Sequence, residues 1–280
     1  MRQFAIWLLA AAVVSAGCDV RVDEHGIRSV RVAEGRAEDV WSRTYTLPTN
    51  GALEVVGENG TIYVRAADGP ETEVRAEREA EATSDEAARA LLQKAQIQEE
   101  VTPTMVRIAT EATEDGGFRA ARVKVDYRIA VPPGLALTFK TKNGDIRLND
   151  VNGRMNAATT NGSITTEDLA GSLTAETLNG PVRVDFSSIA GEVALSTTNG
   201  GIRLTVPPSA KINLDASVVN GRILVDDEFA VSPGEGPSER LSVALNGGGP
   251  KVSATTVNGS VRIRARGAVD SSGVERGQGR

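Results

Sequence analysis

Residues 135–206 read LALTFKTKNGDIRLNDVNGRMNAATTNGSITTEDLAGSLTAETLNGPVRVDFSSIAGEVALSTTNGGIRLTV. The dipeptide Asn-Gly recurs there at residues 143, 161, 179 and 199, with spacings of 18, 18 and 20 residues. Further copies begin at residues 59, 220 and 258. Asn-Gly suits tight corners, because both residues tolerate left-handed backbone angles. The residues expected to form structural corners are Asn143, Gly144, Asn161, Gly162, Asn179, Gly180, Asn199, Gly200, Asn220, Gly221, Asn258 and Gly259.

Aligned on the asparagine, the seven copies share apolar residues at alternate positions. The residue six places before the asparagine is Leu, Met or Val, and the residue three places after it is always Ile or Val. The positions between are mostly polar or charged. This period of two predicts strands with one buried face.

A second glycine lies between successive Asn-Gly pairs, at Gly153, Gly171 and Gly191. Each unit is therefore two short strands and two corners, and it buries its apolar face only when copies stack. The pattern predicts an all-β fold, a β-solenoid of stacked 18–20-residue coils about 4.8 Å apart. An antiparallel meander is the alternative, because Asn-Gly is also a hairpin signal. The constant spacing favours coils.

The N-terminus has the features of an export signal. Residues 1–17 combine Arg2, an apolar run over residues 4–14 and three small residues, as in a secretory signal peptide. The only cysteine, Cys18, follows directly, and Ser-Ala-Gly-Cys resembles the lipobox of bacterial lipoproteins. Ser15 stands where Leu is usual, so cleavage by an ordinary signal peptidase is the alternative. We expect a lipid on Cys18 and a membrane-anchored protein of the bacterial cell envelope.

Composition divides the rest of the chain. Residues 18–40 are charged and predict a tether to a β-strand-repeat domain over residues 41–265. Within the domain, Ser84 and an apolar stripe of helical spacing predict one inserted helix over residues 84–101. Residues 266–280 are rich in Gly, Ser and Arg and predict a disordered tail.

One column of outward residues is a candidate anion-binding site. Four places after the asparagine stand Arg147, Arg183, Arg203 and Arg262. Arginines in register would form a positive stripe suited to phosphate or carboxylate groups of lipid or polysaccharide. The alternative is a solvated face balanced by nearby aspartates. A net charge of −6 favours that alternative and argues against nucleic-acid binding.

A polysaccharide-active β-helix enzyme would need two carboxylates at a defined separation. Asp145, Asp168 and Asp185 fall two, seven and six places after their asparagines, so they share no column. No zinc spacing, phosphate-binding loop or calcium-repeat motif is present. The sequence predicts no catalytic residue, no cofactor and no metal site.

Residues 41–263 resemble the bacterial putative-adhesin family of β-strand-repeat envelope proteins, a domain of unknown function. The resemblance rests on Tyr-Arg-Ile-Ala-Val-Pro-Pro at residues 127–133, the recurring Thr-x-Asn-Gly-x-Ile phrase and the glycine-rich residues 246–249. It implies a β-helix-like stack in an exported, often membrane-attached protein with no established activity. Two classes stay open, a structural or adhesive envelope module and a binding module for an anionic glycan or lipid. The partner would be an envelope glycan or another envelope protein.

Overall fold

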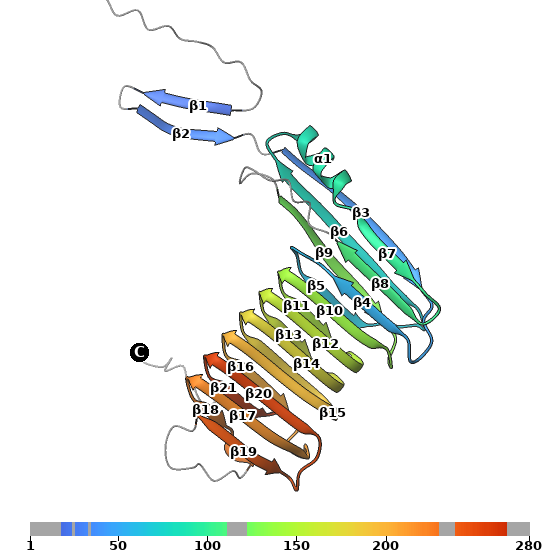
Figure 1. Cartoon of the computed structure of the whole chain (residues 1–280), viewed down its shortest axis with the longest axis vertical. Coiled ribbons are helices and arrows are strands. Elements are labelled where there is room, and N and C mark those ends of the chain that lie inside the picture. Colours follow the sequence, from blue (N-terminus) through green and yellow to red (C-terminus); the bar gives the residue numbers. More distant parts are fainter. Residues whose placement is uncertain (1–17, 24–25, 33–34, 111–121, 230–238, 268–280) are drawn as a thin grey trace, which may run out of the picture.

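The computed structural model describes residues 18–23, 26–32, 35–110, 122–229 and 239–267 (Figure 1). The predicted signal peptide, residues 1–17, lies outside the described residues, as do residues 268–280 of the predicted tail. At Cys18–Asp23 and Gly26–Val32 only the backbone is described, as strands β1 and β2, which pair antiparallel.

The main body is an elongated stack of strands in two sheets, linked by the long strand β15 (Figure 1). Sheet 1 contains the strands that lead into the seven Asn-Gly corners, with β7, β8 and β19 at its ends. The spatial order is β7 (Ile97–Val101), β8 (Met105–Thr110), β4 (Ala52–Val56), β10 (Ala136–Asn143), β12 (Asn152–Asn161), β14 (Leu169–Asn179), β15 (Val182–Asn199), β20 (Lys251–Asn258), β17 (Ile212–Asn220) and β19 (Arg240–Leu245). Sheet 2 contains the strands that leave these corners, with β3, β6 and β9 added at one end. The order is β3 (Gly35–Tyr45), β6 (Thr72–Ala82), β9 (Arg122–Val131), β5 (Ile62–Ala66), β11 (Ile146–Asn149), β13 (Ile164–Glu167), the first part of β15, β16 (Ile202–Val206), β21 (Val261–Ala265) and β18 (Ile223–Val225).

Coils that neighbour each other in the stack pair in parallel, so the predicted solenoid is confirmed and the antiparallel meander is wrong. Leu137 of β10 lies opposite Met155 of β12, which lies opposite Leu173 of β14. Each of these side chains is at most 2% exposed. Rows of like apolar residues therefore stack along the body and fill the space between the two sheets.

The coils do not stack in sequence order. Strand β15 pairs with β20, and β20 in turn pairs with the earlier strand β17. In sheet 2, β21 likewise lies between β16 and β18. The last coil of the chain is thus inserted between the two coils that precede it in the sequence.

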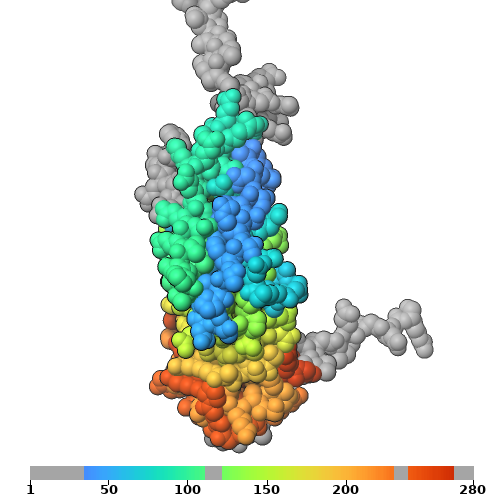
Figure 2. Space-filling view, turned by 90° about the vertical axis from the view of Figure 1, so that its right-hand side faces the viewer, coloured from blue at the N-terminus to red at the C-terminus, as the bar shows by residue number. Residues whose placement is uncertain are grey.

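Antiparallel strands close both ends of the stack. Strands β7, β6 and β3 pair antiparallel at the N-terminal end, and β19 pairs antiparallel with β17 at the other. The Tyr45 hydroxyl of β3 donates to Glu99 Oε2 of β7 at 2.7 Å, which joins the outermost strands of the two sheets. The space-filling view shows the resulting elongated body, with the C-terminal coils at one end (Figure 2).

The inserted helix is shorter than predicted. Helix α1 spans Asp85–Lys94, and the Ser84 hydroxyl caps it by accepting from the Ala87 amide. Residues 97–101, expected to be helical, form strand β7 instead, in a hairpin with β8. Tertiary pairing along the edge of sheet 1 overrides a weak helical pattern there. Helix α1 packs against β3 and β6 through a small cluster of alanine and leucine side chains.

The predicted tether is also too long. Sheet 2 begins at Gly35, because β3 pairs with β6 over its full length from Gly35 to Tyr45. The sequence pattern of charged residues at 36–39 predicts a solvated segment without regular structure. In the structure these residues lie on an edge strand, where exposed charge discourages pairing with other chains. A short 3-10 turn, η1 (Asp227–Phe229), follows β18.

Within the part of the chain that the structure describes, no helix has the length and hydropathy of a membrane span.

Candidate functional site

The seven Asn-Gly asparagines form one continuous row along the body. Six hydrogen bonds of 2.8–2.9 Å join them in the order Asn59, Asn143, Asn161, Asn179, Asn199, Asn258 and Asn220, and in each bond the Nδ2 of the later asparagine in this order donates to the Oδ1 of the one before it. The amides donate and accept in turn along this row, as in the asparagine ladders of cross-β assemblies. These bonds join every coil of the row to its neighbour, so the asparagine side chains have a structural role.

The corner glycines are required for close approach more than for backbone angle. Asn-Gly corners predict left-handed backbone angles, yet among Gly162, Gly180 and Gly200 only Gly180 has a positive φ, and its value of 156° is close to extended backbone. A Cβ on Gly162 would lie 2.0 Å from the Gly144 carbonyl oxygen, and one on Gly200 would lie 2.1 Å from that of Gly180. No side chain fits at these distances, so glycine follows glycine from coil to coil.

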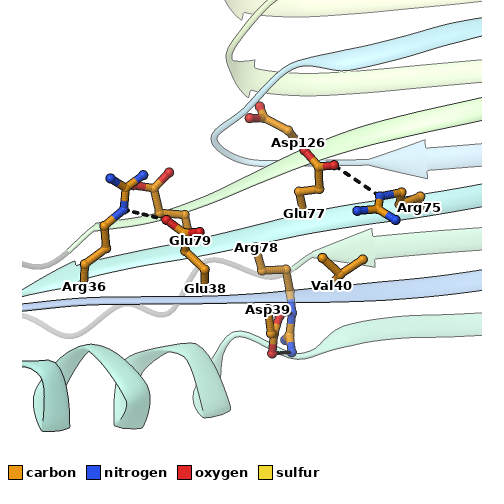
Figure 3. Close-up of a pocket in the computed structure, with 9 residues that line it drawn as sticks. All are labelled: Arg36, Glu38, Asp39, Val40, Arg75, Glu77, Arg78, Glu79 and Asp126. Atoms are coloured by element: carbon orange, nitrogen blue, oxygen red, sulfur yellow. Dashed lines mark hydrogen bonds and ion pairs between the residues drawn. The ribbon is translucent and has the colours of Figure 1, made fainter.

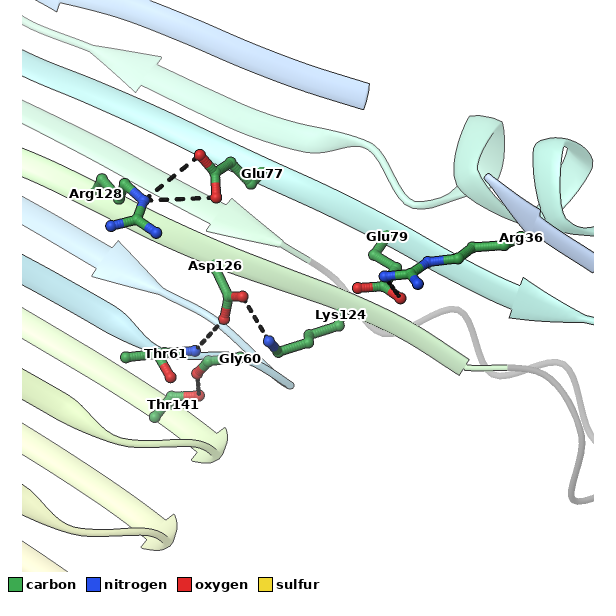
Figure 4. A network of polar contacts seen from close by, with 9 residues as sticks. All are labelled: Arg36, Gly60, Thr61, Glu77, Glu79, Lys124, Asp126, Arg128 and Thr141. Carbon is green, nitrogen blue, oxygen red and sulfur yellow. Dashed lines mark hydrogen bonds and ion pairs between the residues drawn. The ribbon is translucent and has the colours of Figure 1, made fainter. Parts of the chain in front are cut away.

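Threonine and aspartate side chains complete the corners. Thr159 Oγ1 donates to the Gly144 carbonyl of the adjacent coil at 2.9 Å, and four other threonines of the column likewise donate to the corner glycine of a neighbouring coil. Asp145 Oδ1 accepts from both the amide and the hydroxyl of Ser163, at 2.8 and 2.9 Å. Asp126 repeats this role at the first coil by accepting from the Thr61 amide (Figure 4).

The structure places three of the four candidate arginines side by side. Arg183, Arg203 and Arg262 occupy paired positions on β15, β16 and β21, three adjacent strands of sheet 2, and all three are exposed. We call these three residues the arginine row. Because β21 is the inserted last coil, Arg262 lies beside Arg203, and Leu224 is displaced to the end of the column.

Arg147 does not belong to the row. Thr165 lies between it and Arg183 in the stack, and its guanidinium pairs with Asp145 at 3.1 Å. No residue of the arginine row has an ion pair or side-chain hydrogen bond within the described residues. Three adjacent exposed cations repel one another modestly in water, and an anionic ligand would relieve that repulsion.

Asp168 and Asp185, two of the aspartates near this face, are paired with another arginine. Arg266, beyond the last strand, donates to Asp168 Oδ1 at 2.5 Å and lies 3.3 Å from Asp185 Oδ1. Burial raises the pKa of Asp185, Arg266 opposes that rise, and Asp168 and Glu167 add to it. No local pattern pointed to this arrangement, because Arg266 falls in the predicted tail and reaches aspartates about 80 and 100 residues earlier in the chain.

A second group of charges surrounds a surface pocket of about 420 Å³ on β3, β6 and β9 (Figure 3). Its cations are all paired. Arg78 binds Asp39 through two nitrogens, Arg36 pairs with Glu38 and Glu79, and Arg75 and Arg128 both pair with Glu77 (Figures 3 and 4). These pairs connect neighbouring strands and leave no free charge among them to attract a ligand.

The remaining predicted site residue is Cys18. It lies in β1, where its backbone pairs with Val32. Within the described residues there is no group of three or more His, Cys, Asp or Glu side chains arranged to hold a metal ion.

Three solved structures are similar to the chain over most of its length. A putative cell adhesion protein from Clostridium sporogenes is 10% identical, with a TM-score of 0.47 over 82% of this chain and 100% of that one. A putative adhesin from Bacteroides fragilis is 14% identical, with a TM-score of 0.40 over 81% and 97%. A putative lipid binding protein from Parabacteroides distasonis is 10% identical, with a TM-score of 0.32 over 80% and 96%.

Among curated proteins, none matches the chain. A family model does match, over residues 93–266, which is more than half of the chain. The matched region includes the whole run of parallel coils from β10 onward. The chain therefore belongs to the Toastrack DUF4097 family, whose shared domain has no established function.

Proposed function

We propose that the protein is a non-enzymatic adhesive module of the bacterial cell envelope, held at a membrane by a lipid on Cys18. The supporting observation is its surface, in which two long regular faces cover a filled apolar interior. Such faces offer many repeated contacts to a polymer or to another surface. An enzyme instead concentrates a few preorganised groups in a desolvated cleft.

The shape of the body suits this role. Every parallel coil adds about 4.8 Å to the length of the stack, so the outer faces extend away from the N-terminus that the lipid would anchor. The asparagine row and the paired ends keep those faces regular. A second candidate function, binding of an anionic partner, is supported by the uncompensated arginine row.

Anchoring is tested by fractionating cells that express the full chain or its Cys18→Ala variant. We expect the parent protein to sediment with membranes and to incorporate a fatty-acid analogue. The variant should lose the label and either remain as uncleaved precursor or become soluble. Stable attachment needs two acyl chains or more, as on the cysteine of a lipoprotein. A parent protein that is soluble and unlabelled would disprove the anchor.

Adhesion is tested with beads that carry the purified full chain and are washed over isolated cell envelopes. We expect retention well above that of beads carrying the same protein after thermal unfolding, because the faces exist only in the folded chain. Equal retention of folded and unfolded protein would contradict an adhesive role and leave a purely structural one.

A further inference from the structure

We propose that Arg183, Arg203 and Arg262 bind a linear anionic polysaccharide that runs along the axis of the solenoid, across the strands. This inference rests on the proposed adhesive function and deepens it by naming the class of partner. It assigns the partner to one column of sheet 2, on β15, β16 and β21.

The even spacing of the three arginines fits a ligand whose charged groups repeat along a chain. Neighbouring strands are about 4.8 Å apart, so the three paired arginines span roughly 10 Å in one line. A single phosphate or carboxylate engages one or two guanidinium groups, whereas a linear polymer with a charge on each repeat engages all three. Arginine suits this task because its planar fork donates two parallel hydrogen bonds to a carboxylate or phosphate.

The charges of the row are available to such a ligand. Asp168 and Asp185, the carboxylates that could neutralise it, are held by Arg266. On the inserted strand β21, the neighbouring Arg264 lies 3.7 Å from Asp226, so that pair is also internal to the protein. The row is therefore a group of three adjacent arginines on this face for which the described residues supply no ion pair.

The surface beside the row leaves room for a chain. Two residues before each arginine stand Pro181, Gly201 and Ser260, whose side chains are short or absent. These residues lie in line beside the row at the starts of the three strands, where the Val182 amide donates to the Gly201 carbonyl and the Ile202 amide to the Ser260 carbonyl. A polymer lying on them would place its acidic groups next to the guanidinium groups.

A membrane surface and a nucleic acid fit this face less well. The row is one side chain wide, and of the large apolar residues exposed in the described parts of the chain only Leu224 adjoins it. Binding to anionic lipid requires a broader basic patch or buried apolar side chains. The net charge of −6 repels the dense phosphates of nucleic acid.

The test compares two triple variants of the full chain for binding to immobilised alginate, a linear polymer of carboxylated sugars. The first variant is Arg183→Gln, Arg203→Gln and Arg262→Gln. The matched control is Arg75→Gln, Arg128→Gln and Arg147→Gln, which removes three arginines from the same sheet that are already paired with Glu77 or Asp145. Both variants lose the same net charge, and thermal unfolding of each checks the fold.

We expect the parent chain to bind alginate and the first variant to bind roughly tenfold more weakly or worse, with the control close to the parent. Added salt should weaken the parent's binding, since the contacts are exposed. The single variant Arg203→Gln, at the centre of the row, gives the same answer if the triple variant fails to fold.

Equal losses in the two triple variants would overturn the proposal, because they would show a response to net charge alone. Failure of the parent to bind alginate would overturn it as well, and so would preference for vesicles of anionic phospholipid or for polyphosphate over alginate. Neutral dextran should not bind. Bead retention on envelopes tests adhesion separately, so retention without alginate binding would reject this ligand and keep the proposed function.

Discussion

At the scale of single residues, the corner glycines impose a steric limit that a small methyl group already exceeds. Gly162 isolates this effect, because its φ lies outside the left-handed region while its Cβ position is 2.0 Å from the Gly144 carbonyl oxygen. Gly162→Ala should therefore lower the free energy of unfolding by about 1–3 kcal/mol, the usual cost of overpacking. Denaturant unfolding of both proteins measures the difference.

Thr174→Ala is the matched control, because Thr174 is exposed on β14 and its loss should change stability by less than about 0.5 kcal/mol. Equal midpoints for Gly162→Ala and the parent would mean that the coils can separate locally, and that glycine is required there for another reason.

Asp145 makes part of the stability dependent on pH. Burial raises the pKa of this carboxyl, but hydrogen bonds from Ser163 and the charge of Arg147 outweigh burial and hold the pKa below its ordinary value. A carboxyl with a lowered pKa in the folded state stabilises the fold above its unfolded pKa of about 4 and loses that contribution on acidification. The parent chain should thus be more stable than Asp145→Asn at pH 7, and the difference should shrink towards pH 3.

This comparison is made by measuring unfolding free energies of both proteins across that pH range. The amide oxygen introduced by Asp145→Asn can still accept from the Ser163 amide, so the variant removes the charge and keeps the acceptor. A constant difference between the two proteins at all pH values would contradict the electrostatic explanation.

At the scale of elements, the Arg78 side chain links β6, β3 and the end of α1 at the N-terminal end of the stack. Its side chain donates to both carboxylate oxygens of Asp39 on β3 and to the Ala95 carbonyl at the end of α1, at 2.5–2.7 Å. Only 16% of the side chain is exposed, so these charge-assisted bonds are poorly screened. Arg78→Ala should cost about 1.5–3 kcal/mol of unfolding free energy.

Arg75→Ala serves as the control, because Arg75 pairs with Glu77 at the surface of its own strand and such pairs contribute about 0–1 kcal/mol. Hydrogen exchange of the α1 amides should rise in the Arg78 variant and stay unchanged in the Arg75 variant. Similar exchange in both would show that the apolar cluster alone holds the helix.

At the scale of the whole molecule, the inserted last coil makes stability cooperative. Residues 251–265 lie between β15–β16 and β17–β18, so their removal opens the interior of the stack as well as its end. A chain ending at residue 249 should lose β17, β18 and β19 as ordered strands, because each coil is stabilised by its neighbours.

Limited proteolysis of the truncated and full chains tests this expectation. Cleavage within residues 212–225 should become rapid in the truncated chain and remain slow in the full one. Equal protection would mean that β17 can pair directly with β15, as a stack in sequence order would require.

The repeating unit could be predicted from local sequence pattern. Alternating apolar residues and Asn-Gly corners at 18–20-residue spacing specify two short strands per coil, and like residues in every column set the register in which neighbouring coils pair. Slipping the register by one residue would turn the apolar face to solvent, so this part of the fold follows from the pattern alone. The arginine column was visible for the same reason.

The order of the coils, by contrast, depends on tertiary packing. All coils have like residues at the same positions, so the sequence pattern allows each coil to stack on any of several others. Long-range strand pairing decides which coils become neighbours. That choice places Arg262 beside Arg203 and brings Arg266 to Asp168 and Asp185. The full length of β3 and the strand β7 could not be predicted either. Strand β3 forms because it pairs with β6, which is distant in sequence, and β7 forms because pairing with β8 outweighs the local helical propensity.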